Sequence, residues 1–415
     1  MRLLPTSLDD LIPEDHRARE LWRWLDSFDL EPFYARILAR GSSPGRPSTD
    51  PKILLCLWLF ATSEGIGSAR RIALLCERDL AYRWICGGVS LNHHALSDFR
   101  TGFEEELDSL MTEILGVLMH AKVLTLQRVS QDGVRVRASA GAASFRRKRT
   151  LQRCLEEAEK HVAQVKEQGE DESATEKQKK ARERAAQERA ERIRKALEEL
   201  PKAREAKTKK KDKAKTRTST TDPEARVMKM ADGGFRPAYN VQLAVDTESR
   251  FIVGVDVTNK GSDYGELRPM YEQIQKRTGR RPREYLVDGG FAHHKDIAHL
   301  TSEGVTVYAP VPIPRLQKGE SEEERAERVA RRFQPRPQDP EAVAAWRVRM
   351  GTEAAKETYK ERAATVETVN GDLRRHRGLT HIPVRGQAKA RCVALLGALT
   401  YNLLRAMQIL SVPLG

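Results

Sequence analysis

Three acidic residues stand where a catalytic site built on a β-sheet would need them. Asp132 lies within a predicted strand, Asp288 follows a short apolar strand, and Glu367 lies in a C-terminal helical segment. Acids on such elements could hold two divalent metal ions, which catalyse phosphoryl transfer by activating the attacking oxygen and stabilising the leaving oxygen. Magnesium suits this chemistry because it takes few protein carboxylates and leaves positions for phosphate oxygens and water.

Each of these acids also has a structural explanation. Asp132 and Asp288 both precede a glycine and could belong to a turn or a strand end, and Glu367 could pair with Arg374 on its helix. The sequence contains no phosphate loop of the Walker type, no Gly-x-Ser-x-Gly elbow and no His-Glu-x-x-His motif. Spacing alone therefore leaves both interpretations open.

Histidines and cysteines do not form a second candidate site. His93 and His94 are adjacent, so they do not share a helix face. The cysteines form no close pair, which is typical of reduced thiols in an intracellular protein and not of a zinc site or a disulfide framework. They are Cys56, Cys76, Cys86, Cys154 and Cys392.

Charge and hydropathy restrict the class of protein. The chain has 415 residues, with 73 Lys and Arg against 59 Asp and Glu, which gives a formal net charge of +14. This excess favours a polyanionic partner, most often nucleic acid. The longest apolar run, residues 53–61, is too short to span a bilayer. Acidic residues precede any apolar run near the start, which argues against a signal peptide. We expect a cytoplasmic protein without a membrane segment.

Residues 1–124 are predicted to form a helical domain. Thr49 or Asp50 can cap a helix that begins with Pro51 and is almost wholly apolar. Residues 68–100 read as helix, Gly-Gly turn and helix, which fits either a helix-turn-helix or the corner of a plain helical bundle. The candidate DNA-binding residues in this domain are Arg70, Arg71 and Arg100.

The remainder, residues 125–415, is predicted to be an α/β domain. Strands are expected at residues 239–245 and 251–257, joined by a hairpin connection, and a helix at residues 263–276. Further strands and helices alternate after it, which indicates a mixed sheet with helices on its faces. Residues 312–340 are expected to form a surface loop with a short charged helix.

A charged block, residues 146–217, interrupts this domain. It contains 25 Lys and Arg against 15 Asp and Glu, a net charge of +10. The charges are spaced for ion pairs on exposed helices, and apolar residues are too sparse for a core. We expect a charged helical insertion, in the form of a helical hairpin broken near Gly169. It could be a solvated spacer or an electrostatic contact to DNA phosphates.

Three signature regions of the sequence resemble those of bacterial insertion-sequence transposases of the DDE type. They are residues 130–133, residues 285–291, and the stretch from Tyr359 to Arg374. Supporting similarity to the same group lies in residues 45–51, 70–72, 99–100, 220–226 and 239–242. Single motifs are weak, but their order and joint occurrence are specific.

The resemblance implies a ribonuclease-H-like catalytic fold, with the N-terminal helical domain binding the DNA ends. It assigns Asp132, Asp288 and Glu367 as the catalytic, metal-binding acids. Mg²⁺ would be the cofactor, with Mn²⁺ as a substitute. The partners would be the element ends and target DNA, and a homodimer or higher oligomer would form on them. The residues placed near DNA phosphates are Tyr359, Arg362 and Arg374.

One departure from the family pattern leaves the third acid open. The commoner pattern has three residues between the arginine and the glutamate, but four separate Arg362 from Glu367. Glu361 is therefore a rival for the third acid. Asp246 is a rival for an early acid, although a hairpin turn explains it better. Asp222 could lie near the site or cap the strand that follows it.

The leading hypothesis is a DNA transposase that cleaves the ends of a mobile element and joins the freed 3′-hydroxyl ends to target DNA. Both steps are in-line displacements at phosphorus and need no covalent enzyme intermediate. One alternative is a metal-dependent nuclease on the same fold, which a strand-transfer assay would distinguish. The other is a non-catalytic DNA-binding protein, which would bind in a salt-sensitive way without any metal requirement.

Overall fold

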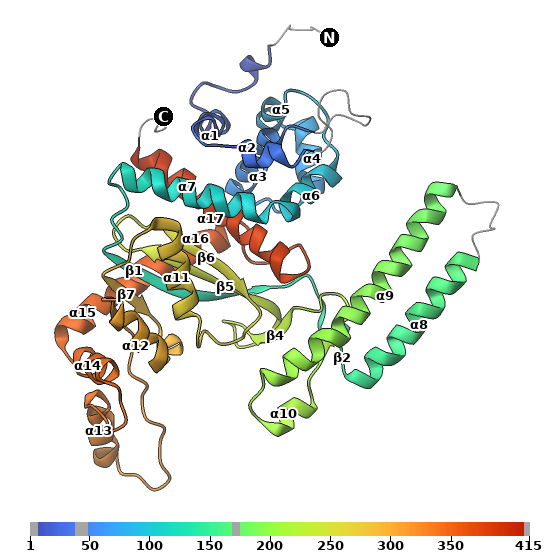
Figure 1. Ribbon diagram of the computed structural model, residues 1–415. Coiled ribbons are helices and arrows are strands. Elements are labelled where there is room, and N and C mark those ends of the chain that lie inside the picture. The colour runs from blue at the N-terminus through green and yellow to red at the C-terminus, as the bar shows by residue number, and fades with distance from the viewer. Residues whose placement is uncertain (1–6, 38–48, 168–174, 411–415) are drawn as a thin grey trace.

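The computed structural model describes residues 7–37, 49–167 and 175–410. It contains a twisted mixed sheet flanked by helices, an N-terminal group of helices on one side of it, and a long helical arm (Figure 1). The expected α/β organisation is confirmed at this level. The loop expected before Pro51 lies largely outside the described residues, and so does the break expected near Gly169.

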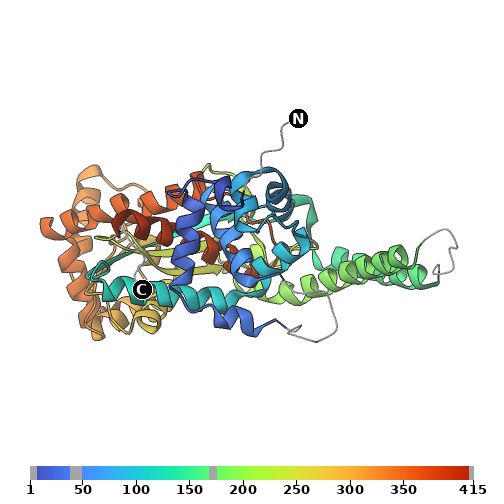
Figure 2. The same ribbon diagram turned by 90° about the horizontal axis from the view of Figure 1, so that it is seen from above.

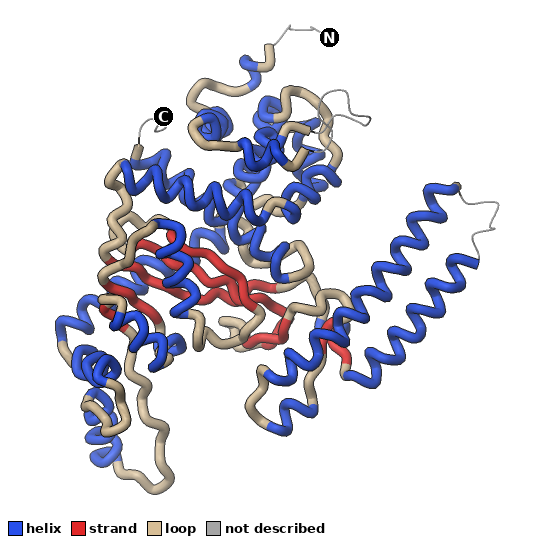
Figure 3. The backbone as a smooth tube through the Cα atoms, in the orientation of Figure 1, coloured by secondary structure: helices blue, strands red, loops and turns tan. Residues whose placement is uncertain are grey.

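The sheet has the strand order β4-β5-β1-β7-β8, with β6 also paired to β5. Strand β1 is antiparallel to β5, which is antiparallel to β4 and β6, whereas β1, β7 and β8 run parallel. Figure 3 shows the strands gathered in one layer among the helices. Their bounds are β1 Arg128–Arg137, β4 Arg226–Lys229, β5 Phe235–Asp246, β6 Ile252–Thr258, β7 Glu284–Val287 and β8 Thr306–Tyr308.

Two predicted helices have different limits in the structure. The helix expected at residues 263–276 starts only at Leu267, because Gly265 adopts a positive φ of 81° just before it. The segment from Ser68 to the Gly-Gly turn forms two helices, since the side chain of Asp79 accepts hydrogen bonds from the first amides of the second one. At both places the helix limits are therefore set by local capping or backbone conformation and not by the spacing of apolar residues.

The N-terminal helices pack on the sheet domain through one continuous hydrophobic core. Their longest apolar member, α3, begins at Pro51, and Asp50 caps it by accepting from the amide of Lys52 at 2.8 Å. The domain boundary at residues 124 and 125 stays a prediction. The helices are α1 Arg17–Asp26, α2 Glu31–Ala35, α3 Pro51–Ser63, α4 Ala69–Arg78, α5 Leu80–Ile85, α6 His93–Gly102 and α7 Glu104–His120.

Helix α17 (Gln387–Ile409) joins the two parts. It contacts α3, α6 and α7 on one side and β6 on the other. The side-chain amide of Asn402 bonds both backbone groups of Ile252, at 2.9 and 2.8 Å, and so fastens β6 to the helix. By length and composition α17 could cross a membrane, but 61% of its most apolar window is buried inside the fold. It is accordingly a core helix here.

The charged insertion forms an arm that projects from the body (Figures 1 and 2). Its two long helices are α8 (Lys148–Glu167) and α9 (Glu176–Glu205), which are joined along a narrow apolar seam that includes Ala158 and Ile193. A two-stranded sheet of β2 (Phe145–Arg146) and β3 (Thr218–Ser219) closes the base, beside the short helix α10 (Lys210–Ala214). The described residues thus agree with the expected helical insertion.

The other helices cover the sheet and its parallel edge. They include the short charged helix expected within residues 312–340, which is α13. A continuous helical segment after residue 353 has α-helical ends and a π-helical middle. The elements are α11 Leu267–Thr278, α12 His294–Ser302, α13 Glu322–Ala330, α14 Glu341–Met350, α15 Glu353–Arg362, the π-helix Ala363–Glu367 and α16 Thr368–Arg375.

Candidate active site

Asp132 and Asp288 lie on neighbouring parallel strands. Gln131 of β1 pairs with Val287 of β7, so each aspartate comes directly after a paired residue at the same level of the sheet. Asp288 is exposed and accepts a hydrogen bond from the amide of Gly289 at 2.6 Å. The pairing of strands β1 and β7 therefore places two acids that are 156 positions apart in the sequence at one point of the sheet.

The helical segment that follows α15 adds Glu367 to this point. The guanidinium of Arg362 donates to Asp132 at 2.9 Å and to Glu367 at 3.0 Å, which links the two acids. The π-helix contacts β1 and β5. Asn370, one turn further on, donates to the second oxygen of Asp132 at 3.1 Å. The helical segment thus supplies the acid Glu367, and two of its side chains, Arg362 and Asn370, donate hydrogen bonds to Asp132.

Electrostatics at this cluster reflects the gathering of acids. Burial raises the pKa of Asp132, and Asp263 and Asp288 raise it further, whereas Arg362 opposes them. Burial alone would lower the pKa of Arg362, but Asp132, Asp288 and other nearby groups raise it above its usual value. The carboxylates are thus close enough to interact, and Arg362 is the cation that they share.

A fourth carboxylate, Asp263, stands beside the three predicted acids. It accepts hydrogen bonds from Asn240 at 2.7 Å and Gln242 at 2.8 Å, and it pairs with Arg135 at 2.6 Å. Asp263 was not predicted as a site residue, because the sequence places it at the start of a helix, whereas it lies in the loop before α11. A signal was present: two buried amides alternate along the apolar strand β5 and need a polar partner.

Two glycines allow the backbone to approach these acids. A Cβ on Gly133 would overlap Asp263 Oδ1 and would lie only 2.5 Å from Gln242 Nε2. The position of a Cβ on Gly290 is 3.9 Å from Asp288 Oδ2 and 4.0 Å from Asp263 Oδ2. One point therefore lies within about 4 Å of both carboxylates, which shows that Asp263 belongs to the cluster.

The cluster fits a divalent cation by charge. Asp132, Asp263, Asp288 and Glu367 carry four negative charges, while the arginines bonded to them, Arg362 and Arg135, carry two. Two of the acids already bind one cationic group, a guanidinium. Within the described ranges, however, no three acidic, histidine or cysteine side chains stand close enough together to hold one ion. Arg362 occupies oxygens of Asp132 and Glu367 that an ion would use.

Tyr359 belongs to the same neighbourhood. Burial raises its pKa to about 12, with Asp288, Asp132 and Glu367 adding to the shift. The hydroxyl is therefore protonated at neutral pH, so it can donate a hydrogen bond and does not act as a base. Tyr359 and Arg362, which the sequence placed near DNA phosphates, both stand beside the acids.

The rival acids lie elsewhere. Glu361 forms an ion pair with Arg128 at the start of β1, together with Glu284. Asp246 accepts from the amide and hydroxyl of Ser249 at 2.9 and 2.6 Å, as the hairpin explanation predicts.

Asp222 does not join the acid cluster. It is buried near the base of the arm, where it accepts from Tyr239 at 2.8 Å and from the amide of Gly386 at 3.1 Å. It holds the residue before α17 and does not cap the strand that follows it.

The other predicted DNA contacts divide into two groups. Arg70 and Arg71 are exposed on α4, and Arg374 is exposed on α16. Arg100 is buried instead, where it donates to the carbonyl of Gly67 at 2.6 Å and lies over the ring of Trp58. Arg100 is therefore not exposed for a DNA contact in this structure, because its guanidinium is bonded inside the fold.

Comparisons with known proteins gave two matches to family models. A model described as a transposase DDE domain matches residues 203–403, and a model described as a transposase domain (DUF772) matches residues 6–102. The first match includes Asp288 and Glu367, whereas Asp132 lies between the two matched ranges. No curated protein and no solved structure matches the chain.

Proposed function

Because the chain belongs to the insertion-sequence transposases of the DDE type, we propose that it cleaves the ends of a mobile DNA element and joins the freed 3′-hydroxyl ends to target DNA. The observation that carries this proposal is the shared guanidinium of Arg362, which links Asp132 with Glu367 beside Asp288. The first acid lies on the first strand, the second just past a later strand, and the third on a helix that returns to the sheet. This order supports a ribonuclease-H-like catalytic fold.

In the proposed reaction, Asp132, Asp288 and Glu367 would hold Mg²⁺, or Mn²⁺ in its place. Bound divalent ions would neutralise charge that develops on the phosphoryl oxygens and activate the attacking water or hydroxyl. Arg362 would leave at least one carboxylate and turn to a DNA phosphate, for which its planar fork of donors is suited. Asn370 would keep Asp132 oriented while Arg362 moves. Tyr359, protonated at neutral pH, would donate to the DNA backbone.

The partners follow from the same assignment. The family implies DNA as the partner. We propose that the element end and the target are both bound, with two or more protomers on the DNA because two ends must be cut. The exposed cations Arg70, Arg71 and Arg374 are the proposed phosphate contacts, and the cytoplasmic location stays a prediction.

The decisive experiment uses Asp288→Asn, which keeps the shape of the side chain and removes its charge. The purified variant is compared with wild type in Mg²⁺-dependent cleavage of duplex DNA carrying the element end, and in end binding measured in EDTA. We expect cleavage to fall on the order of 10³-fold, or several kcal/mol in the barrier, while binding persists. Cleavage at the wild-type rate would remove Asp288 from the site.

A strand-joining assay distinguishes a transposase from a metal-dependent nuclease on the same fold. A pre-cleaved end with a free 3′-hydroxyl is incubated with target DNA and Mg²⁺, and joined product is measured. Cleavage without joining would indicate a nuclease on the same fold. Tight, salt-sensitive binding with neither reaction would indicate a non-catalytic DNA-binding protein.

A further inference from the structure

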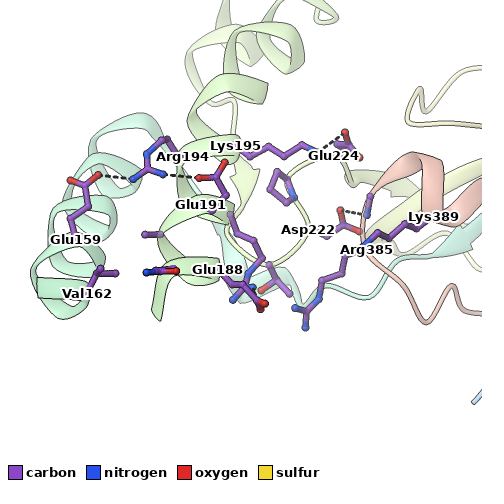
Figure 4. Close-up of a pocket in the computed structure, with 16 residues that line it drawn as sticks. Glu159, Val162, Glu188, Glu191, Arg194, Lys195, Asp222, Glu224, Arg385 and Lys389 are labelled. Atoms are coloured by element: carbon purple, nitrogen blue, oxygen red, sulfur yellow. Dashed lines mark hydrogen bonds and ion pairs between the residues drawn. The ribbon is translucent and has the colours of Figure 1, made fainter. Parts of the chain in front are cut away.

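A cavity of about 760 Å³ lies between the arm and the body, apart from the acid cluster. One wall is the face of α9 that carries Glu188, Arg192 and Lys195, and the other is formed by residues 221–224 and the start of α17 (Figure 4). Its volume is in the range of ligand-binding sites. None of the proposed catalytic acids lines it.

Much of the negative charge in this cavity is already compensated. Arg194 binds Glu159 at 3.0 Å and Glu191 at 2.7 Å, and Lys195 binds Glu224 at 3.1 Å. Figure 4 shows these pairs as dashed lines, none of which reaches Arg385 or Lys389 among the residues drawn. These pairs join two cations to three acids, so the charges of Arg194 and Lys195 are fully used and a net charge of −1 remains.

The other two acids of the cavity also have partners. Asp222 accepts from Tyr239 and from the amide of Gly386, as described above. Glu188 binds Arg184 at 2.9 Å and reaches Arg192 only at 3.8 Å. The first amides of α17 are occupied as well, since Glu224 accepts from Gln387 at 2.6 Å. The helix terminus is thus not the source of an anion site.

Three cations of the lining remain: Arg192, which pairs with Glu188 at 3.8 Å, and Arg385 and Lys389, which form no ion pair within the described part of the chain. Burial lowers the pKa of Arg192, and the nearby Arg385 lowers it further. Two guanidinium groups from different elements, the arm and the segment before α17, thus interact unfavourably across the cavity. A bound anion would relieve this repulsion, and arginine binds phosphate through two parallel hydrogen bonds.

We infer that this cavity binds phosphate groups of a DNA strand through Arg192, Arg385 and Lys389. The inference rests on the proposed function for the identity of the polyanion, and on the cavity and its charges for the site. On this inference the arm is not a solvated spacer. It forms one side of a DNA-binding cleft, and the body of the protein forms the other side.

The path along β1 indicates which part of the DNA would be held there. From Asp132 to Arg137 the strand advances about 17 Å, at roughly 3.3 Å per residue. Arg137 forms a β-bridge with His381, four positions before Arg385. Because duplex DNA rises about 3.4 Å per base pair, the cleft would hold phosphates about five or more base pairs from the bond that is cut.

The test compares two double variants of the full chain. R192A/R385A removes cations of the cleft, and K177A/K180A removes two exposed cations near the other end of α9. The probe is a short duplex DNA, with the dissociation constant measured against NaCl concentration in EDTA, so that catalysis does not contribute. Arg385→Ala alone, at an exposed position, covers the case in which the double variant fails to fold.

We expect R192A/R385A to weaken binding and to reduce the slope of log K against log salt by about 1–2, since each phosphate contact contributes about 0.9. K177A/K180A should keep the wild-type slope. Equal slopes for wild type and R192A/R385A, or equal losses in both double variants, would overturn the inference. Binding of inorganic tripolyphosphate that needs Arg385, with DNA binding unaffected by its loss, would also overturn it in favour of a small anion.

Failure of this inference and failure of the proposed function give different results. A wild-type protein that binds DNA but does not cleave it with Mg²⁺ contradicts the proposed function alone. A wild-type protein that cleaves, together with an R192A/R385A variant that binds as wild type does, contradicts only the cleft.

Discussion

Arg362 and Glu367 are hydrogen-bonded at 3.0 Å although they are five positions apart in one helical segment. The turn between them, Ala363–Glu367, is π-helical. In a regular α-helix, residues four apart share a face and residues five apart do not. The π-turn takes up the one residue by which this sequence departs from the commoner family spacing, so Glu367 returns to the face of Arg362 and Asp132.

This relationship predicts that Ala364, an exposed residue of the π-turn, can be deleted. Its loss would convert the turn to α-helix and leave the arginine and glutamate four apart, with the rest of the helix in register. We expect a folded protein with a melting temperature close to wild type and measurable Mg²⁺-dependent cleavage. Deletion of Glu357 in the regular helix α15 is the control. It should rotate the residues beyond it by about 100° and abolish cleavage. Loss of folding in the Ala364 deletion alone would contradict this account.

Neutralising the two candidate third acids should have very different effects on cleavage. Glu367→Gln removes a charge beside Asp132, so we expect cleavage to fall on the order of 10³-fold. Glu361→Gln removes an ion pair with Arg128, which lowers the free energy of unfolding by about 1 kcal/mol at most. Cleavage by this variant should stay within about threefold of wild type. The measurement is the initial cleavage rate of each variant at saturating Mg²⁺. A large loss for Glu361→Gln and little change for Glu367→Gln would make Glu361 the third acid.

Asp263 should act as a positioning residue for the acid cluster. Asp263→Asn retains an acceptor for Asn240 and Gln242 but loses the ion pair with Arg135. We expect cleavage to fall about 10–100-fold, the usual cost of losing a supporting contact at a metal site. The Mg²⁺ concentration for half-maximal rate should also change, which a general loss of stability would not cause. Asp232→Asn, at an exposed acid, serves as the control.

Gly133 is predicted to tolerate no side chain. Gly133→Ala would place a Cβ against Asp263 and the amides of Asn240 and Gln242. We expect a loss of about 1–3 kcal/mol in the free energy of unfolding, measured with urea, together with loss of cleavage. Gly116→Ala is the matched control, because a Cβ at Gly116 meets nothing within 4 Å. An unchanged unfolding midpoint for Gly133→Ala would show that the side chains around Asp263 can move to make room for a methyl group.

The buried Asp222 should make stability depend on pH. Burial raises its pKa above the usual value, and its Oδ2 has no hydrogen-bond partner. A raised folded-state pKa means that its contribution is fully present below the unfolded value of about 3.8. This contribution is lost as pH rises through the folded value. Asp222→Asn removes this dependence, so its stability relative to wild type should increase between about pH 4 and neutrality. A difference that does not vary with pH would contradict this prediction.

Much of the architecture was predictable because it depends on local patterns. The apolar strands, the buried helix α3 with its Asp50 cap and the charged arm all follow from period, capping and composition. The order of the signature regions was also sufficient to indicate the transposase family, which the family models confirm. The structural inferences use residues that are close together in the chain, and the family assignment uses the order of short motifs along it.

The types and order of the three acids can be read from the sequence, but their surroundings depend on how the chain folds. The pairing of β1 with β7 sets Asp132 beside Asp288, and the π-turn returns Glu367 to Arg362. Asp263 lies beside these acids although it belongs to a loop, and Arg100 is buried in the core. These outcomes depend on strand register, helix phase and the need of buried polar groups for partners. Such properties arise when distant segments meet, so no local pattern records them.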